Sequence, residues 1–473
     1  MRIRVARPHP TLQRGVRILQ PRRLHLSQTP SDFDVAVPAI ARAQASRTYA
    51  RGLWRIAAAD VSAGNQVALL RNGPAAFDAM AALIEAARVE VSMEQYIFRR
   101  DDVGLRFRDA LVAAARRGIR VRLLVDWVGR MGTPMSFFAP ITEAGGEVRI
   151  FQRPGLRPWL GLLPRDHRKL LVVDRTSGIT GGIGIGMEWK NGILRQRRSP
   201  WRDTAVRIAG PAAVDMATSF DRMWTLAGGT VHLQFGSLRT PNASHLDPYH
   251  DPPSLVGIIE GEPARQRVSR ALQMQAIGAE RSIWLASAYF APSWSVVEAL
   301  AGAARDGVDV RVLVPSRYDH PWLRTLISPF IRRLLGSGVR LWEWRGEMMH
   351  AKTSVVDGRW VRVGSTDYNL LGVAINYELD AVIEDPTLGQ QAEAMFLEDL
   401  EQSRELFVRR PHGAKRRADD PPTAVPALQQ SGPGDSGPVR QLGPRSDVDR
   451  VVPGDARDNP KPSHASRVPK SGE

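Results

Sequence analysis

The sequence predicts an α/β protein built from two homologous lobes, because an internal repeat and a pair of matching short motifs divide it into two similar halves. Residues 109–125 match residues 298–314 at ten of 17 positions. In both copies, apolar residues with helical spacing end at a glycine and pass into alternating valine and leucine. This pattern predicts a helix, a glycine C-cap and a buried strand.

A further strand, ending in an aromatic residue, precedes each of these helices. The two strands are predicted at 91–98 and 282–290. Short strand–helix–strand connections favour a mainly parallel sheet with helices on both faces. We therefore expect two such lobes with one active site at their interface.

Composition divides the chain into five parts. The linker is rich in Pro, Asn, Asp and Ser, and the last 63 residues contain 11 Pro and no Phe, Trp or Tyr, a composition that predicts disorder. The expected parts are a basic N-terminal arm (1–56), the first lobe (57–240), the linker (241–255), the second lobe (256–410) and a disordered Pro-rich tail (411–473).

Charge and composition restrict the partners. The arm carries eleven Arg against two Asp, so it holds +9 of the formal net charge of +16, and the lobes are only mildly basic. This distribution favours an anionic membrane surface over nucleic acid, whose binding grooves are usually more basic. A transit peptide or an inert leader remains an alternative for the arm. No run of 18 apolar residues predicts a transmembrane helix, so we expect a protein peripheral to the membrane, on its cytoplasmic face.

Two short motifs carry the chemistry. They read HRKLLVVD at 167–174 and HAKTSVVD at 350–357, followed by GG at 181–182 and GS at 364–365. Residues two apart on a strand project to one face, so each His should lie beside its Lys. The chain has 59 Arg and only six Lys, yet both motifs use Lys. A compact ammonium beside an imidazole indicates a phosphate site.

These motifs, with their flanking elements, resemble the phospholipase D superfamily over roughly residues 66–400, and the subfamily of bacterial cardiolipin synthases within it. The resemblance implies that His167 is a nucleophile that forms a phosphohistidine and that His350 is the acid and then the base, although the two roles could be exchanged. Lys169 and Lys352 would neutralise the phosphate oxygens, and no metal or other cofactor would be needed. The acids that orient the histidines would be Asp203 and Glu378.

The remaining motif residues divide into phosphate contacts and structural acids. Gly182 and Ser365 are expected at the phosphate, whereas Asp174 and Asp357 are expected to close turns, because their odd spacing places them off the histidine face. The sequence departs from the family pattern where Asn usually contacts the phosphate: Gly184 and Asp367 stand there.

Two segments could meet lipid. Residues 155–167 are both apolar and basic, which suits either insertion among headgroups, led by Trp159 and Leu162, or a loop folded onto the core. Residues 321–338 favour an ordinary amphipathic core helix over a lipid-facing one.

The expected activity is transfer of a phosphatidyl group between glycerolipids such as phosphatidylglycerol. Three alternatives remain: hydrolysis to phosphatidic acid, cleavage of nucleic-acid phosphodiesters, and a catalytically idle lipid-binding scaffold. The acceptor alcohol and the oligomeric state are not indicated by the sequence.

Overall fold

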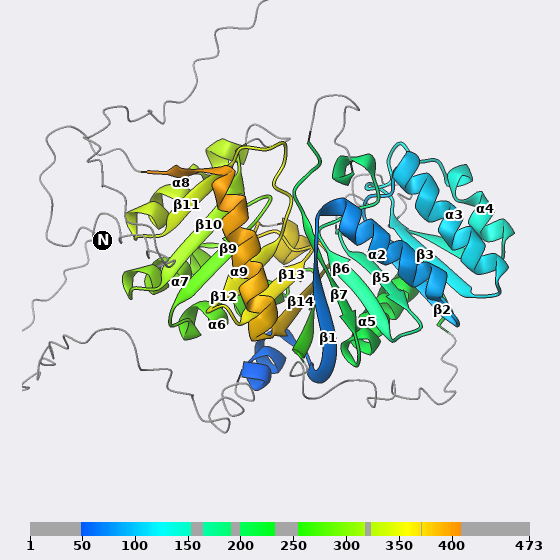
Figure 1. The fold of residues 1–473 in the computed structure, drawn as a ribbon, viewed down its shortest axis with the longest axis horizontal. Helices are drawn as coiled ribbons and strands as arrows, with labels where there is room; N and C mark the ends of the chain where they lie inside the picture. The colour runs from blue at the N-terminus through cyan, green and yellow to red at the C-terminus, as the bar shows by residue number, and fades with distance from the viewer. Residues whose placement is uncertain are drawn as a thin grey trace, which may run out of the picture. The chain divides into compact units, whose positions relative to one another are not determined.

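The computed structural model describes residues 49–152, 164–190, 199–231, 254–316, 323–369 and 371–407. Its described strands form one continuous 15-stranded sheet in the order β15-β11-β10-β9-β12-β13-β14-β8-β1-β7-β6-β5-β2-β3-β4. Lobe 1 runs from β1 to α5 and lobe 2 from β8 to β15. The halves are joined where β1 pairs with β8, so they share one sheet (Figure 1).

The elements of lobe 1 are β1 (Val61–Arg71), α2 (Asn72–Ala86), β2 (Glu90–Gln95), α3 (Asp102–Arg116), β3 (Arg120–Asp126), the 3-10 helix η1 (Met135–Phe137), α4 (Ala139–Glu143), β4 (Glu147–Phe151), β5 (Lys169–Val173), β6 (Ser177–Gly181), the 3-10 helix η3 (Met187–Trp189), β7 (Thr204–Ala209) and α5 (Ala212–Leu226).

The elements of lobe 2 are β8 (Ser254–Gly261), α6 (Arg267–Gly278), β9 (Ser282–Ala286), α7 (Trp294–Arg305), β10 (Asp309–Pro315), α8 (Leu323–Gly336), β11 (Arg340–Trp344), β12 (Thr353–Val356), β13 (Trp360–Gly364), the π-helix η5 (Leu371–Ile375), β14 (Glu378–Glu384), α9 (Pro386–Glu401) and β15 (Ser403–Leu406).

The repeat folds as predicted. In lobe 1, Gly118, with φ +82°, lies two residues beyond the end of α3, and β3 follows. In lobe 2, Gly307, with φ +100°, lies two residues beyond the end of α7, and β10 follows. Only glycine adopts this left-handed conformation without steric cost, which explains the shared residue at the end of both helices. The prediction of a helix, a glycine cap and a strand is confirmed in both copies.

The expectation of a mainly parallel sheet was wrong. Parallel pairing among the described strands is confined to β2-β3-β4 and to β9-β10-β11. The strands that follow each HxK motif are joined by tight turns, β5 to β6 and β12 to β13, and therefore pair antiparallel. The sheet is mixed because each lobe adds such an antiparallel meander to a parallel strand–helix unit.

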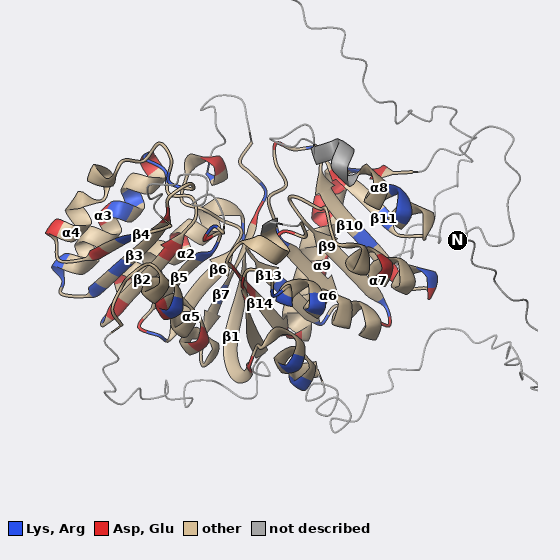
Figure 2. Ribbon diagram, turned by 180° about the vertical axis from the view of Figure 1, so that it is seen from behind, with Lys and Arg blue, Asp and Glu red and all other residues tan. Residues whose placement is uncertain are grey.

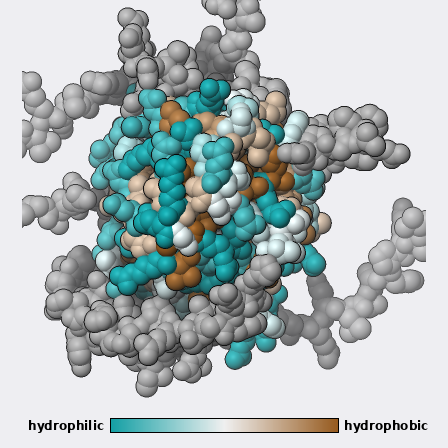
Figure 3. All heavy atoms as spheres, turned by 90° about the vertical axis from the view of Figure 1, so that its right-hand side faces the viewer, coloured by the Kyte–Doolittle hydropathy of each residue, from teal (hydrophilic) through white to brown (hydrophobic). Residues whose placement is uncertain are grey.

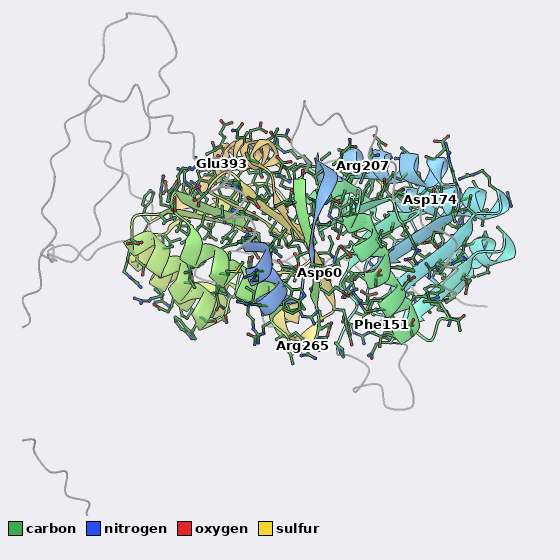
Figure 4. All side chains as sticks on the ribbon, turned by 90° about the horizontal axis from the view of Figure 1, so that it is seen from below. Asp60, Phe151, Asp174, Arg207, Arg265 and Glu393 are labelled. Atoms are coloured by element: carbon green, nitrogen blue, oxygen red, sulfur yellow. The ribbon has the colours of Figure 1, made fainter. Side chains whose placement is uncertain are left out.

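Helices cover both faces of the sheet. The helices α2, α3 and α9 lie on one face and α5, α6 and α7 on the other (Figures 1 and 4). A central apolar cluster draws residues from α5, α9 and the middle strands of both lobes, while separate clusters lie under α2 and α3 and under α6 and α7. The middle of the sheet is thus held firmly from both sides.

Only the end of the predicted arm lies within the described residues. Residues 49–57 form a helix that packs on lobe 2, with Leu53 buried and the Tyr49 hydroxyl 2.7 Å from Gln275 Nε2. The rest of the arm, most of the linker and the tail lie outside the described residues. The segment expected to be amphipathic forms α8, where Leu334 is buried against lobe 2 and the exposed Arg333 pairs with Glu298 of α7.

The surface mixes charge signs. Acidic and basic residues are interspersed on the face shown in Figure 2. The end of lobe 1 near α3 and α4 presents mostly hydrophilic side chains with scattered hydrophobic ones (Figure 3). No helix in the described part of the chain combines the length and apolar character needed to cross a bilayer.

Candidate active site

Backbone hydrogen bonds attach each of the two motif segments to the opposite lobe. The His167 N–H donates to the Tyr377 carbonyl at 2.9 Å, and the His350 N–H donates to the Arg202 carbonyl at 2.8 Å. Tyr377 and Arg202 each directly precede one of the two acids that the sequence predicted to orient the histidines. The backbone therefore brings each histidine to the acid of the other lobe.

The side chains follow this crossing. His167 Nδ1 lies 2.9 Å from Glu378 Oε1, and His350 Nδ1 lies 2.7 Å from Asp203 Oδ2. Both carboxylates are fully buried. We call these pairs the Glu378–His167 dyad and the Asp203–His350 dyad. Sequence reasoning named the four residues but did not assign which acid faces which histidine.

The two motif lysines are buried beside the histidines. Lys169 Nζ donates to the His167 carbonyl at 2.5 Å, and Lys352 Nζ donates to the His350 carbonyl at 2.7 Å. The charges of Lys169, Lys352 and His350 all act on the His167 ring. The two motifs, 183 positions apart in the sequence, thus form a single electrostatic cluster.

Burial dominates the electrostatics of the Glu378–His167 dyad. Burial, reinforced by the charges of Lys169 and Lys352, holds the pKa of His167 well below its usual value. Burial also raises the pKa of Glu378 well above its usual value, although Lys169 opposes this change. Both effects favour a neutral imidazole at this position.

The Asp203–His350 dyad is more strongly ionic. Burial opposes ionisation of Asp203, but the charge and hydrogen bond of His350, together with Lys352, lower the pKa of this carboxyl below its usual value. Burial and Lys352 together outweigh Asp203, so the pKa of His350 lies below its usual value. The ionised Asp203 carboxylate opposes this change and makes His350 easier to protonate than burial alone would allow.

Gly182 and Ser365 lie against the acids. The Ser365 hydroxyl donates to Glu378 Oε2 and accepts from the Leu379 N–H at 3.0 Å. A Cβ atom at Gly182 would lie 2.2 Å from Asp203 Oδ1. The described contacts of both residues thus position carboxylates, and their expected contact with phosphate stays a prediction.

Trp189 is a site residue that sequence reasoning missed. Its indole Nε1 donates to Asp203 Oδ2 at 2.8 Å, and its ring centroid lies 5.6 Å from that of His350. A Cβ atom at Gly184 would lie 2.8 Å from the indole ring. The glycine that departs from the family pattern therefore leaves room for this indole, and that departure was the one available signal.

Two further aromatic rings border the histidines. Tyr96, at the end of β2, packs edge-on against His167 with centroids 4.7 Å apart, and Lys169 Nζ lies 5.4 Å from its centroid. Trp201 lies 5.3 Å from the His350 ring. These rings pack against one side of each imidazole. Tyr96 lies within the strand predicted at 91–98, whose terminal aromatic residue is Phe98, so the sequence did not single it out.

Asp367, the second departure, joins the cluster. Its Oδ2 atom lies 3.3 Å from Lys352 Nζ, and both side chains are buried. In lobe 1 the corresponding position is Gly184, which offers no carboxylate to Lys169. The two half-sites therefore differ in charge at one equivalent position.

Asp174 and Asp357 lie at the far ends of β5 and β12, away from the histidines. Each has a positive φ, and the two carboxylates accept backbone N–H groups from residues 88–90 and 280–282 respectively. Asp174 marks the turn after β5 in the view from below (Figure 4). These contacts favour the interpretation of both residues as turn-closing acids.

The apolar approach segment falls largely outside the described residues, including Trp159 and Leu162. Arg165, at its end, is buried with Nη1 3.7 Å from Asp126 Oδ1. Among the described residues, no three His, Asp or Glu side chains are grouped as metal ligands.

Comparison with known proteins identifies relatives that cover most of the chain. The family model described as "Cardiolipin synthase, PLD-like domain" matches residues 80–224 and 274–400. Cardiolipin synthase A of Pseudomonas putida is 33% identical over 371 residues, which are 77% of this chain and 74% of the relative. The major cardiolipin synthase of Bacillus subtilis is 32% identical over 356 residues, 73% of this chain and 72% of the relative.

The fold has a solved counterpart. The crystal structure of phosphatidylserine synthase from Haemophilus influenzae superposes with a TM-score of 0.56 at 14% identity. The match covers 76% of this chain and 92% of that one, and at this identity it shows the fold alone.

Proposed function

We propose that this chain, which belongs to the cardiolipin synthase family of phospholipase D-like proteins, joins two phosphatidylglycerol molecules into cardiolipin and releases glycerol. The observation that carries the proposal is the shared site, in which each histidine is held by an acid from the opposite lobe. Phosphodiester exchange needs a nucleophile, an acid and cations that stabilise developing charge. The cluster supplies a candidate for each.

His167 is the proposed nucleophile. A nucleophilic imidazole must be neutral, and burial holds the pKa of His167 well below its usual value. If its Nδ1–H donates to Glu378, the lone pair lies on Nε2. Nε2 then attacks phosphorus, a P–N bond forms, and the P–O bond to the departing glycerol breaks to leave a phosphohistidine.

His350 is the proposed acid and base. In the first step its protonated ring gives a proton to the departing glycerol oxygen, and the ionised Asp203 carboxylate stabilises that protonated ring. In the second step the neutral His350 removes the proton from the hydroxyl of a second phosphatidylglycerol. That oxygen attacks phosphorus, the P–N bond breaks, and His167 is regenerated.

Lys169 and Lys352 are the proposed charge partners of the phosphate. Both ammonium groups are buried, so their attraction for a non-bridging oxygen is weakly screened. They lie beside the histidine that attacks and the histidine that protonates. The negative charge that grows on the phosphate in the transition state is thus stabilised from both lobes.

The acceptor decides between a transferase and a hydrolase, since water could also resolve the phosphohistidine. We place the enzyme peripherally at an anionic membrane surface, on its cytoplasmic side, where a second glycerolipid is concentrated. The relatives named above are synthases, and the arginine-rich first 48 residues suit such a surface. The mixed charge of the described faces does not favour a nucleic-acid groove (Figure 2).

The test is to identify the products made by the purified full chain from labelled phosphatidylglycerol, presented either in vesicles or dispersed in detergent. We expect cardiolipin and glycerol as the main products, with faster turnover on vesicles. Phosphatidic acid as the main product on vesicles would replace the synthase with the hydrolase. Cleavage of single-stranded DNA with no lipid turnover would favour a nuclease.

A further inference from the structure

Asp367 is built into the active site by contacts on both of its carboxylate oxygens. Its Oδ1 atom accepts from the Tyr289 N–H at 3.1 Å and from the Ser287 hydroxyl at 3.4 Å. Its Oδ2 atom is the one that lies 3.3 Å from Lys352 Nζ. The side chain is therefore fixed with one oxygen directed at a proposed phosphate-binding lysine.

The two lysines consequently differ in how far their charge is compensated. Lys352 has the Asp367 carboxylate within ion-pair distance, whereas no ion pair to Lys169 is found in the described part of the chain and the Glu378 charge acts on it from a greater distance. The Asp367 charge also acts on Lys169, His350 and Glu378. Asp367 therefore influences residues of both half-sites.

We propose that Asp367 determines the charge of the ligand that this site accepts, by selecting phosphodiesters with one negative charge over phosphomonoesters with two. The inference rests on the proposed function, because it concerns the same phosphate site. In this role Asp367 is a specificity-determining residue that acts through Lys352 and takes no part in bond making.

The physical reason is electrostatic balance in a buried cluster. Two lysines supply the positive charge of the site, and the carboxyl groups of Glu378, Asp203 and Asp367 act against it before any ligand arrives. A diester adds one negative charge, while a monoester, whose second pKa is about 6, adds nearly two at neutral pH. Repulsion from a fixed carboxylate a few ångströms away is large in a poorly hydrated site and doubles for the dianion.

This selection has a use in the proposed reaction. Phosphatidic acid, the product of accidental hydrolysis, is a phosphomonoester, and two uncompensated lysines would bind it more strongly than the diester substrate. A carboxylate at position 367 weakens the binding of that product more than it weakens the binding of the substrate. This carboxylate is present in lobe 2, which carries the proposed acid His350. The equivalent position in lobe 1, which carries the proposed nucleophile His167, is a glycine.

The test compares methyl phosphate, a dianion, with dimethyl phosphate, a monoanion, as ligands of the full chain. Isothermal titration calorimetry at about pH 7.5 measures both affinities without turnover, so the result does not depend on which lipid is the substrate. The variant is Asp367→Asn, which keeps an acceptor for Tyr289 and Ser287 but removes the charge. We expect its affinity for methyl phosphate to rise roughly tenfold more than its affinity for dimethyl phosphate.

Two controls make the outcome decisive. Asp367→Glu keeps the charge and should keep the ratio of the two affinities close to that of the parent chain. Asp306→Asn removes one exposed charge at the C-cap of α7 and should leave both affinities unchanged. Equal changes for the two ligands in Asp367→Asn, or a lost ratio in Asp367→Glu, would show that Asp367 is only a structural partner of Lys352. If Asp367→Asn does not fold, a lost ratio in Asp367→Glu still overturns the proposal.

Discussion

In lobe 1 the acid of the site is Asp203, supported by an indole and ionised more readily than a free carboxyl. In lobe 2 the acid is Glu378, supported by the Ser365 hydroxyl and held by burial toward its protonated form. The backbone around the two acids is nearly the same, because each directly follows a residue whose carbonyl accepts from the opposite histidine. The difference therefore lies in side chains at equivalent positions.

This comparison shows how a duplicated half-site can take on two roles. A firmly ionised acid stabilises a protonated imidazole, and so the Asp203–His350 dyad suits proton donation. A buried acid with a raised pKa and two nearby ammonium groups favour a neutral imidazole, and so the Glu378–His167 dyad suits nucleophilic attack. Asp367 adds to the asymmetry, because it lies beside the lysine of only one half.

The largest expected effect comes from removing each histidine in turn. His167→Ala should lower kcat/KM by at least roughly four orders of magnitude on any phosphodiester, because the covalent step is lost. His350→Ala should lose as much on a lipid but only roughly tenfold to a hundredfold on a diester with a nitrophenolate leaving group, which needs no proton. The measurement is kcat/KM on phosphatidylglycerol and on the nitrophenyl diester.

The same experiment shows whether the roles of His167 and His350 are exchanged. If the nitrophenyl diester rescues His167→Ala and not His350→Ala, the assignment of nucleophile and acid must be reversed. Equal losses on both substrates in both variants would contradict any division of labour between the halves. Circular dichroism of each variant controls for loss of the fold.

A smaller effect is expected from the groups that support the acids. Ser365→Ala removes a hydrogen bond that lowers the pKa of Glu378, so that pKa rises further. The ionised carboxylate is the stronger acceptor for the His167 Nδ1–H that fixes the lone pair on Nε2, and it would then be present only at higher pH. We expect kcat/KM to fall roughly tenfold near neutral pH and its acid limb to move to higher pH. Trp189→Phe removes a donor to Asp203, which stays ionised at neutral pH even at the usual pKa of a carboxyl.

Trp189→Phe is thus the matched variant in the other half. It should change kcat/KM by less than roughly threefold and leave the acid limb in place, because one of several stabilising contacts to Asp203 is lost. A shift of the limb in Trp189→Phe but not in Ser365→Ala would mean that Asp203 is the weakly ionised acid. The pH profiles of both variants on a soluble diester provide the measurement.

Much of this candidate site could be predicted from the sequence, because the patterns that mark it lie within short segments. The repeat, the HxK spacing and the glycine caps are properties of short segments, and they predicted the lobes, the two histidines and the two lysines. The crossing of the dyads was not accessible, because it depends on which loops meet across the joined sheet. The antiparallel meanders were missed because hydrophobic spacing marks a strand but does not give its direction.

The roles of the two departures were hidden for the same reason. Gly184 appears in the sequence as a lost donor, and only the packing shows that an indole fills the space. In the sequence, Asp367 is a carboxylate where a phosphate contact is expected, and only the structure shows that Lys352 lies beside it. Contacts between side chains far apart in the sequence decide both cases.

The smallest expected effect concerns the two lysines and appears at alkaline pH. Burial, reinforced by Lys352, lowers the pKa of Lys169 to about 8. Its ammonium is therefore present below that pH and is lost as the pH rises through it. Because only the charged form attracts a phosphodiester, kcat/KM should fall above about pH 8, measured on a soluble diester.

Substitution by arginine separates the two lysines. Lys169→Arg keeps its charge at every accessible pH, so the alkaline limb should disappear even though the rate is lower. Lys352→Arg leaves Lys169 in place and should retain the limb. The kcat profile of the parent chain should stay level to higher pH than kcat/KM, because a bound phosphodiester stabilises the ammonium. An alkaline limb that persists in Lys169→Arg and vanishes in Lys352→Arg would assign the titrating lysine to the other lobe and reverse this part of the comparison.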